Sequence, residues 1–464
     1  MKITDGTASK GGSIYASQQS HIDHDGKCLF INNEAKSMEG GGSLYLSFSN
    51  FIRAMENTVG KSSLFSNTAP NGGAATVVGE VQMNHLLIKN HKSSMSGTIH
   101  ILGTEATASS TSSTSFLTLT SIDMDSNLAN DYGGHVYVGS RSSLTATDVK
   151  FTNGTAIKGG GALFGNDEAK DIHLKKVIIQ RNQNTAVIFE GKSIQIDSSS
   201  MSDNHADRVA TNGGGALLVR NQANATILNT IFQRNVATNR EGGDIVCAGG
   251  SFCILKNSAF YGTVVKPGSD PLEGILGTLL PSKGGAVAIL SGSTTHILDT
   301  TFNNTKAKVG GGAIFVGFSS LVTKGVIIDS GRSNKGAGIL LESAVQASLI
   351  ETTFIQCESV YDGGALHATT SVVKGKDLKF LNNRAGIFGG AVLISEDASL
   401  ELSDSIMTGN IAWLGGALAM DRDSFASIST TTFSHNQARM GGAFYVSVNP
   451  SPVIFKHSIF QHNT

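Results

Sequence analysis

The sequence is poor in charge and in long apolar runs, and each shortage excludes a class of function. Charged residues make up 15% of the 464 positions and the formal net charge is −1, whereas ordinary soluble domains carry roughly 25% charge. A near-neutral chain without a basic cluster is not built to hold nucleic acid by its phosphates. No run of consecutive apolar residues approaches the length of a transmembrane helix. We therefore expect no nucleic-acid partner. We expect contact with a membrane only through a segment outside this sequence.

Helical patterning is also missing, whereas glycine is abundant. No window carries a convincing apolar stripe at the helical period, and 55 of the 464 residues are glycine, which weakens helix interiors. Short runs such as 399–403 and 426–429 alternate instead at period two and are rich in Ser, Thr, Val and Ile. This alternation predicts half-buried strands.

Glycine pairs recur at a fixed interval in the C-terminal third of the chain. Their first glycines are spaced by 26 residues or by 52, and a small residue and an aliphatic residue follow each pair. A repeat of this length cannot bury its apolar side chains alone, so neighbouring copies must stack. The glycines that we assign to this structural repeat are Gly311, Gly312, Gly363, Gly364, Gly389, Gly390, Gly415, Gly416, Gly441 and Gly442.

A second phrase, hydrophobic-x-x-Asn, follows the glycine phrase by about 16 residues and recurs along the chain. One asparagine in each repeat can stack on the next, so that the side-chain amides bond to each other and to the turn backbone. The phrase therefore predicts an asparagine ladder with a structural role. Its assigned members include Asn33, Asn235, Asn383, Asn410 and Asn436.

The two phrases together predict an all-β fold, a right-handed parallel β-helix of about 16–17 coils. Each repeat is expected to hold three short strands and three turns, and strands that recur without helices between them lie parallel only by coiling round an axis. Residues 1–464 are expected to form one continuous domain. The second and fourth positions after each glycine pair should line the interior and the third should point out. The inward examples are Val392, Ile394, Leu418 and Met420, and the outward ones Leu393 and Ala419.

Two interruptions of the repeat are candidate recognition loops. The first is an insertion at about 262–283 that contains Pro267, Pro271 and Pro281 together with five aliphatic residues, and the second is a Ser/Thr-rich loop at about 104–115. Either segment can equally be a tolerated insertion. For the first loop we expect that deleting 264–280 leaves the β-helix folded and weakens surface binding.

The alternation of the two phrases resembles the repeats of chlamydial polymorphic outer membrane proteins, where Gly-Gly-Ala-(Ile/Leu/Val) alternates with Phe-x-x-Asn. The resemblance covers essentially the whole chain. It implies an autotransporter-like passenger that is secreted, displayed at the cell surface, associated with the outer membrane and adhesive toward a cell-surface protein or glycan. Residues 1–10 lack the apolar region of a signal peptide and the last residues stop inside a repeat, so we expect a fragment of a longer chain. The strict form Gly-Gly-Ala-(Ile/Leu/Val) occurs seven times, with its alanine at Ala162, Ala216, Ala286, Ala313, Ala365, Ala391 and Ala417.

The rival hypothesis is a polysaccharide lyase or glycoside hydrolase on a β-helix scaffold. Such enzymes need carboxylates that converge on one substrate. The carboxylates that align here form a column, Asp299, Glu351, Asp377 and Asp404, whose members on consecutive coils would be roughly 5 Å apart. A column screened by solvent is the favoured interpretation, and a calcium-binding row is the alternative. We therefore predict a non-enzymatic protein and assign no catalytic residue, cofactor or metal.

Cysteine and histidine add little to the prediction of function. Cys247 and Cys253 bracket five residues and could close a small disulfide if the chain is secreted, a pairing that the sequence leaves open. Cys357 stands where the ladder predicts asparagine, and Cys28 is isolated. The only dense group of metal-ligand residues is 21–25, which is more typical of a polar loop than of a metal site.

Overall fold

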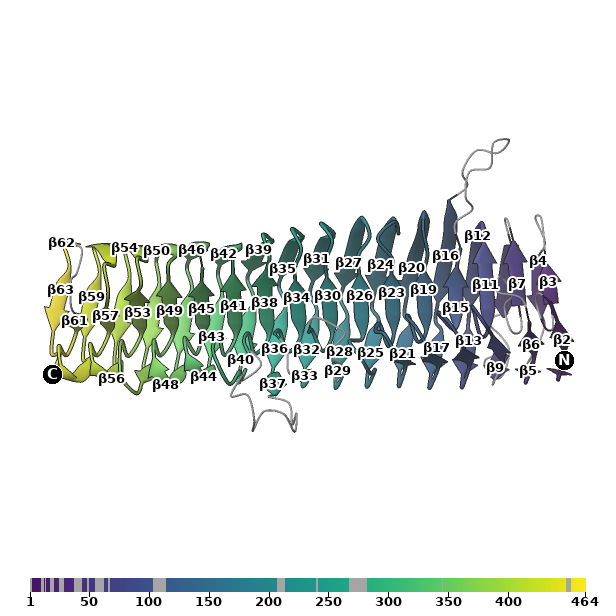
Figure 1. The fold of residues 1–464 in the computed structure, drawn as a ribbon, viewed down its shortest axis with the longest axis horizontal. Coiled ribbons are helices and arrows are strands. Elements are labelled where there is room, and N and C mark those ends of the chain that lie inside the picture. The colour runs from purple at the N-terminus through teal and green to yellow at the C-terminus, as the bar shows by residue number, and fades with distance from the viewer. Residues whose placement is uncertain are drawn as a thin grey trace, which may run out of the picture. The chain divides into compact units, whose positions relative to one another are not determined.

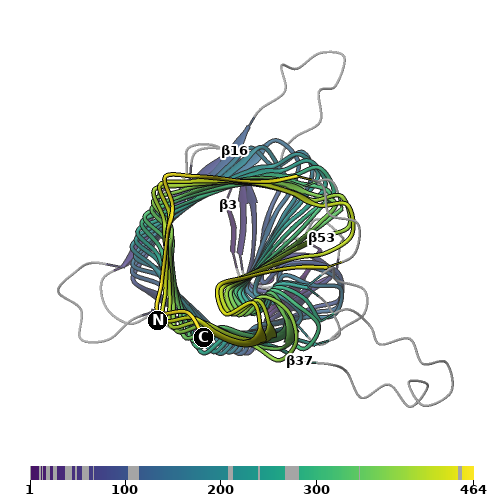
Figure 2. The same cartoon turned by 90° about the vertical axis from the view of Figure 1, so that its left-hand side faces the viewer.

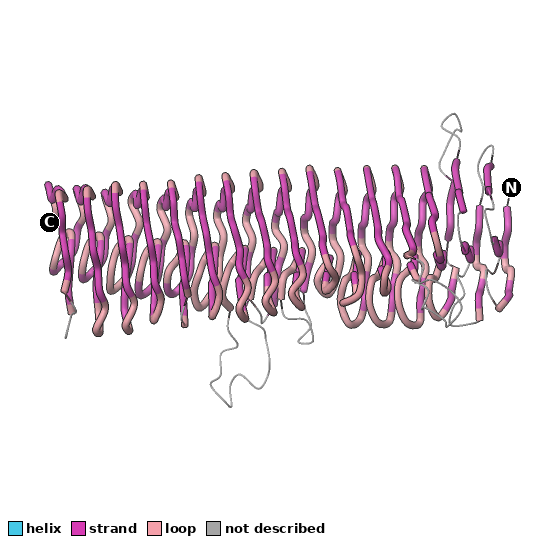
Figure 3. Tube along the Cα trace, turned by 90° about the horizontal axis from the view of Figure 1, so that it is seen from above, coloured by secondary structure: helices cyan, strands magenta, loops and turns pink. Residues whose placement is uncertain are grey.

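The structure is a computed structural model of the whole chain, and its described residues form strands and turns without any helix. The strands run from β1 (Lys2–Thr4) to β63 (Ile459–Gln461), and Figure 3 shows them alternating with short connections. The structure describes all residues except 1, 10–11, 13, 17–20, 25–28, 37–43, 48–49, 55–61, 66, 103–113, 207–212, 239–240, 267–281, 344 and 448–451.

The chain divides into two compact units. The first comprises Met1–Thr211 and Gly215–Thr226, and the second comprises Asn212–Gly214 and Ile227–Thr464. The expectation of one continuous domain stays a prediction.

One coil of the second unit shows how the sequence repeat becomes structure. After the turn at Gly389 and Gly390, the chain forms β53 (Val392–Ser395), β54 (Ser399–Ser403), β55 (Ile406–Thr408) and β56 (Ile411–Leu414). The coil therefore has a short fourth strand beyond the three that the pattern predicts. Each strand pairs in parallel with its copy one coil on: β57 (Leu418–Met420), β58 (Phe425–Ser429), β59 (Thr432–Ser434) and β60 (Gln437–Met440).

Equivalent strands lie over one another when the coils are viewed end-on (Figure 2). The first unit repeats the arrangement, with β19 (Val136–Val138) paired to β23 (Leu163–Gly165) and β20 (Ser142–Thr147) to β24 (Asp171–Lys175). Each pairing joins residues about one repeat apart, as in Val136 with Leu163. The predicted fold class, a parallel β-helix, is confirmed.

The interior of the coils is filled by the positions that the alternation selects. Val392, Ile394, Leu418 and Met420 are all buried. Phenylalanines of the second phrase stack ring on ring through the core of the second unit, with 4.7 Å between the ring centroids of Phe260 and Phe302. Offset stacks of this kind add about 0.5–1.5 kcal/mol per pair beyond the burial of area.

The outward third positions are not exposed, which corrects the expectation for them. Leu393 is 4% exposed and Ala419 is fully buried. The cause is the turn at the first glycine of each pair, which folds the preceding segment back over the strand. A Cβ at Gly415 would lie 3.1 Å from the Cβ of Ala419, and one at Gly363 would lie 2.9 Å from the Cβ of His367. The third side chain therefore leaves the coil interior but is covered by the glycine turn.

The insertion is narrower than the interval 262–283. Residues 267–281 lie outside the described residues, but the segments beside them belong to the coil. The strand β37 (Val264–Lys266) pairs with β33 (Val236–Thr238), and Val265 and Ser282 are buried. A deletion that starts at residue 264 would remove β37, so the boundary of the expected deletion is wrong and moves to residue 267.

Most of the Ser/Thr-rich loop at 104–115 also lies outside the described residues. Its last residue, Ser115, is buried and begins β16 (Ser115–Thr120). The loop therefore ends at Thr114, and its role in recognition stays a prediction.

Candidate functional site

The asparagine phrase builds a buried row of hydrogen bonds along the second unit. The backbone N–H and the Nδ2 of Asn383 both donate to Oδ1 of Asn410, each at 3.0 Å. Asn410 donates in the same way to Asn436, at 3.0 and 2.9 Å, and its Nδ2 also reaches the carbonyl of Phe380 at 3.1 Å. The side chain of Asn410 thus links its own coil to the coils before and after it, because its Oδ1 accepts from Asn383 and its Nδ2 donates to Asn436 and Phe380. Buried polar groups in folded proteins are generally paired in this way.

The first unit has a row of the same kind, which includes Asn33. Its backbone N–H and Nδ2 donate to Oδ1 of Asn67 at 2.7 and 3.0 Å, and the N–H of Asn67 donates to Nδ1 of His91 at 3.2 Å. A buried histidine therefore occupies a ladder position where the phrase predicts asparagine.

The assigned glycines form the sharp turn before the first strand of a coil. In all five pairs the first glycine has positive φ, between 58 and 67°, a conformation that L side chains rarely adopt. The second glycine meets backbone of the next coil, as at Gly364, where a Cβ would run into the carbonyl of Gly390. Both glycines are thus structural.

Asn235 has a partner that the sequence did not reveal. Its Nδ2 donates to Oδ1 of Asp244 at 2.7 Å, and the hydroxyl of Thr263 donates to the other carboxyl oxygen at 2.5 Å. Asp244 is fully buried, and burial raises the pKa of its carboxyl from 3.8 to about 8, despite both hydrogen bonds. The sequence did contain a sign of this contact: aspartate follows the glycine pair at Gly242-Gly243-Asp244, where most other copies of the phrase have alanine.

His135 makes the same departure in the first unit, after Gly133 and Gly134. Its Nδ1 lies 2.8 Å from Nδ2 of Asn127, and its Nε2 would lie 2.5 Å from a Cβ at Gly154. Burial lowers the pKa of this imidazole from 6.5 to about 4. His135 and Asp244 therefore reach the ladder from the alanine position, and both act inside the scaffold.

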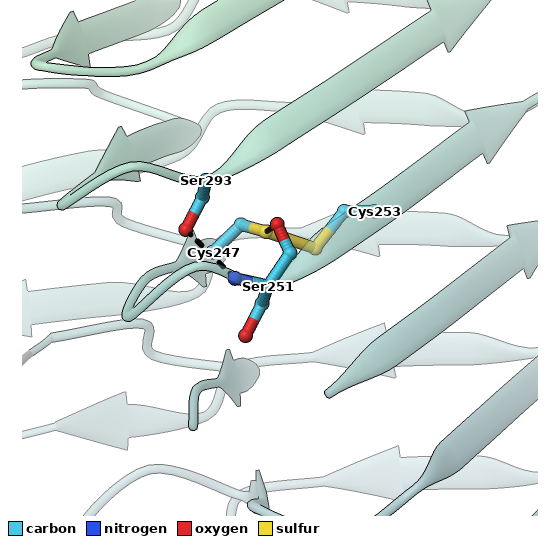
Figure 4. Close-up of a disulfide and its surroundings, with 4 residues drawn as sticks. All are labelled: Cys247, Ser251, Cys253 and Ser293. Carbon is cyan, nitrogen blue, oxygen red and sulfur yellow. Dashed lines mark hydrogen bonds between the residues drawn. A yellow bond between two sulfur atoms is a disulfide. The ribbon is translucent and has the colours of Figure 1, made fainter. Parts of the chain in front are cut away.

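The two cysteines that bracket five residues are bonded. The Cys247–Cys253 disulfide joins two buried cysteines across a short turn of the second unit, where the N–H of Ser251 donates to Oγ of Ser293 at 3.2 Å (Figure 4). Cys357 is buried and free, and burial raises the pKa of its thiol to about 12. A thiol in this environment packs and does not react. Cys28 lies outside the described residues.

The acidic column lies on exposed turns between the second and third strands of the coils. Glu351, Asp377 and Asp404 come from consecutive coils and have φ of 48, 55 and 53°, whereas the coil between Asp299 and Glu351 has Gly325 in this place. Among the described residues, no group of three or more His, Cys, Asp or Glu side chains is arranged to hold a metal ion. The backbone of β4 (His21–His24) is described, but its side chains and Asp25 are not.

A row of exposed apolar side chains follows the short fourth strands of the second unit. These strands are β44 (Arg332–Lys335), β48 (Glu358–Asp362), β52 (Arg384–Ala385), β56 and β60, which form one sheet (Figure 1). We call the solvent side of this sheet the short-sheet face. Tyr361, Ile387 and Trp413 are 45%, 40% and 51% exposed and occupy equivalent places, because the N–H of Ile387 donates to Tyr361 O and that of Leu414 to Ile387 O.

The short-sheet face also gathers cations. The guanidinium carbon of Arg439 lies 4.7 Å from the centroid of the Trp413 ring. Lys306, Arg332, Glu358 and Arg384 pair in register on successive coils, and a hollow of ≈ 300 Å³ opens between the first three of them. Sequence reasoning missed the face because its members are about one repeat apart, although this spacing at residues 361, 387 and 413 was a usable signal.

Comparisons with known proteins agree with this architecture. A family model described as a right-handed β-helix region matches residues 160–355. The metabotropic glutamate receptor-like protein R of Dictyostelium discoideum is 28% identical over 191 residues, which are 41% of this chain and 11% of that protein. The chain thus spans about a tenth of the length of this curated relative. Together with the parallel pairing of the coils, the family match shows a right-handed parallel β-helix.

A solved structure, that of the PL6 family alginate lyase AlyGC, aligns with 99% of this chain and 100% of its own. The sequence identity is 9% and the TM-score is 0.19, which is too low to establish a relationship of fold or of activity. In the part of the chain that the structure describes, no helix is long and apolar enough to cross a membrane.

Proposed function

We propose that this chain is a non-enzymatic segment of a secreted or surface-displayed protein and that it binds the surface of another cell. The proposal includes a protein of the chlamydial polymorphic outer membrane type, as the two repeat phrases suggest. The observation that carries the proposal is the short-sheet face, where Tyr361, Ile387 and Trp413 stand exposed in one row.

The row is suited to binding because the scaffold fixes its side chains. Every one of these residues lies on or beside a strand that pairs with the coils on both sides, so little conformational entropy is lost when a ligand binds. Tyrosine, tryptophan and arginine are the residues that dominate binding energy at protein interfaces. Exposed apolar side chains in a contiguous row mark contact surfaces.

The disulfide supports a location outside the cytoplasm. Cytosolic proteins of ordinary organisms rarely keep a structural disulfide, whereas secreted and surface proteins do, and Cys247 and Cys253 are both buried in the coil. The proposal therefore includes a location outside the cell. Attachment to an outer membrane would come from a segment that is not in this sequence.

The enzymatic alternative has weaker support from geometry. β-Helices occur among enzymes and among proteins without enzymatic activity. A glycosidase pair flanks the bond that it cleaves, with its acid in a desolvated pocket. Glu351, Asp377 and Asp404 are exposed and form a single row, because each lies at the same turn of one of three consecutive coils. They do not face one another across a hollow.

The proposal is tested by binding of the purified chain to cells. A variant with Tyr361→Ser, Ile387→Ser and Trp413→Ser should lose most of its binding. A control with Phe318→Ser, Ile327→Ser and Ile406→Ser removes side chains that are 68%, 41% and 42% exposed elsewhere on the same unit, and should bind as the wild type does. Equal loss in both variants, or the release of sugar fragments from polysaccharides by the wild type, would contradict the proposal.

A further inference from the structure

We infer that the short-sheet face binds an anionic polysaccharide, with its carboxylate or sulfate groups against the cations of the face. The inference rests on the proposed function and adds the class of ligand. Six cationic side chains lie on this face or on the coil directly before it, and two acidic ones lie among them. The cations are Lys306, Lys308, Arg332, Lys335, Arg384 and Arg439, and the acids are Glu358 and Asp362.

Most of these cations are not neutralised by the protein. Arg332 has one exposed ion pair, with 3.9 Å between its Nε and Oε2 of Glu358, and exposed pairs of this kind hold weakly. Within the described part of the chain, Lys308, Arg384 and Arg439 have no carboxylate at ion-pair distance. The chain as a whole carries a formal net charge of −1, so the positive excess is a property of this face.

The spacing of the cations suits a linear polymer of charges. Lys306 and Arg332 lie in register on consecutive coils, Glu358 takes this place on the third coil and Arg384 on the fourth, and neighbouring coils are about 4.8 Å apart. A sugar unit in an extended polysaccharide advances by a similar length, so acidic groups on neighbouring units can meet Lys306 and Arg332, and one two units further on can meet Arg384. The hollow of ≈ 300 Å³ is lined by Lys306, Lys308 and Arg332 and by the single acid Glu358, so cations predominate in it and it gives one such group a recess.

The aromatic side chains complete a site for sugars. The Arg439 guanidinium rests on the Trp413 ring, which holds its planar donors ready for a bidentate bond to carboxylate or sulfate. Tyr361, 45% exposed, offers an apolar ring with a hydroxyl at its end, and sugar rings also have an apolar face and a polar rim.

Other polyanions and proteins fit this face less well. Domains that bind nucleic acid have a strongly basic overall charge, whereas this chain is almost neutral. Interfaces between proteins are depleted in lysine, whereas three of the six cations here are lysines. The disulfide points to a compartment in which cell-surface glycans are the abundant polyanions.

The test measures binding of the purified chain to immobilised heparin, which carries sulfates, and to polygalacturonate, which carries carboxylates. The variant Lys308→Ser, Arg332→Ser and Arg384→Ser should bind the preferred polymer at least about tenfold more weakly near 0.15 M salt. Its slope of log affinity against log salt should also be smaller by about two, since each lost contact releases fewer counterions.

A matched control removes the same charge from another sheet. Lys324→Ser, Lys374→Ser and Lys376→Ser change exposed lysines of β42 (Ser320–Lys324) and β50 (Val372–Lys376), and should leave affinity within about twofold. Far-ultraviolet circular dichroism shows whether each variant keeps its β structure. The single variant Trp413→Ala should weaken binding several-fold, because Arg439 loses its support.

Three results would overturn the inference: no binding of the wild type to either polymer at low salt, an equal loss in the control, or equal affinity for single-stranded DNA. Cell binding separates this inference from the proposed function. If the wild type binds cells but neither polymer, the inference fails and the proposed function stands. If it binds a polymer through this face but no cells, the inference stands and adhesion fails.

Discussion

Two stretches of the ladder in the second unit solve the same packing problem differently. From Asn383 to Asn436 every coil contributes an asparagine, and both Asn410 and Asn436 accept a backbone and a side-chain hydrogen bond from the asparagine one coil before. Near Asn235 the acceptor is instead the carboxyl of Asp244, which comes from the alanine position of the glycine phrase and also bonds Thr263. The amide row does not titrate, whereas the carboxyl does.

The difference shows that a carboxyl from the glycine phrase can take the place of the ladder amide as a hydrogen-bond acceptor. A buried polar atom without a partner costs free energy, so any side chain that reaches the position and completes the bonds is tolerated. In the first unit His135 also reaches the ladder from the alanine position and lies against Gly154, where its Nδ1 contacts Nδ2 of Asn127 while its buried Nε2 has no hydrogen-bond partner among the described residues. A regular stretch and a substituted stretch should then respond differently to mutation and to pH.

The largest effect is expected from Asn410→Leu. The change leaves the backbone N–H of Asn383 without an acceptor, removes one of the two acceptors of Asn383 Nδ2, and removes one of the two donors to Oδ1 of Asn436, since the backbone N–H of residue 410 remains. Unpaired buried groups cost about 1–3 kcal/mol each, so the free energy of unfolding should fall by about 3 kcal/mol. Urea unfolding followed by circular dichroism measures it. Asn303→Leu, at a half-exposed asparagine of β40 (Thr301–Asn303), is the control and should change stability little, and an equal effect of both would refute the ladder's role.

The sequence predicts the scaffold well because its rules are local. A positive-φ turn needs glycine, and Gly363 and Gly389 therefore appear at the same place in each coil. The partner of Asn235 was not predictable in this way, because Asp244 reaches it only after the chain has turned at the glycine pair. Leu393 was placed wrongly for a related reason: alternation says which side of a strand a residue faces, and not what covers that side.

The short-sheet face was hidden from sequence reasoning for a different reason. Composition averages over the chain, so a formal charge of −1 conceals a local excess of cations. Arg332 and Arg384 are brought to one row only by the stacking of coils. Their position could be found by aligning the repeats on the glycine pairs and looking for alignment columns that hold charged residues in several repeats.

The second prediction concerns the pH dependence of the substituted stretch. The pKa of Asp244 is raised from 3.8 to about 8 in the folded chain, so between these values the folded state holds a proton that the unfolded state has lost. The contribution of Asp244 to stability is therefore fully present below pH 4 and falls as the pH rises toward 8. The variant Asp244→Asn copies the neutral acid, since its Oδ1 can accept from Asn235 and its Nδ2 can donate to Thr263.

Melting temperatures of wild type and Asp244→Asn measured from pH 4.5 to 8.5 test this sign. The variant should match the wild type at the acidic end and become the more stable of the two as the pH rises, and comparing the two proteins cancels other titrating groups such as His367. Asp244→Ala, which leaves Asn235 and Thr263 unpaired, should be less stable by about 2 kcal/mol at the acidic end. Parallel profiles for wild type and Asp244→Asn would show that this carboxyl does not titrate in the window.

The smallest effect is expected from extending the regular stretch by one coil. Cys357 occupies the ladder position before Asn383, and its N–H already donates to Oδ1 of Asn383 at 3.0 Å. In Cys357→Asn the new Nδ2 should add the second bond to this oxygen, as in Asn383 and Asn410, while its carbonyl faces the N–H of Gly331. The gain is about 0.5–1 kcal/mol, the net value of one hydrogen bond, measured as a shift of the urea midpoint. Cys357→Ala serves as the reference, because it keeps the backbone bond without the amide. If Cys357→Asn is less stable than Cys357→Ala, the position is limited by volume and not by hydrogen bonding, and the rule drawn from Asp244 does not extend to it.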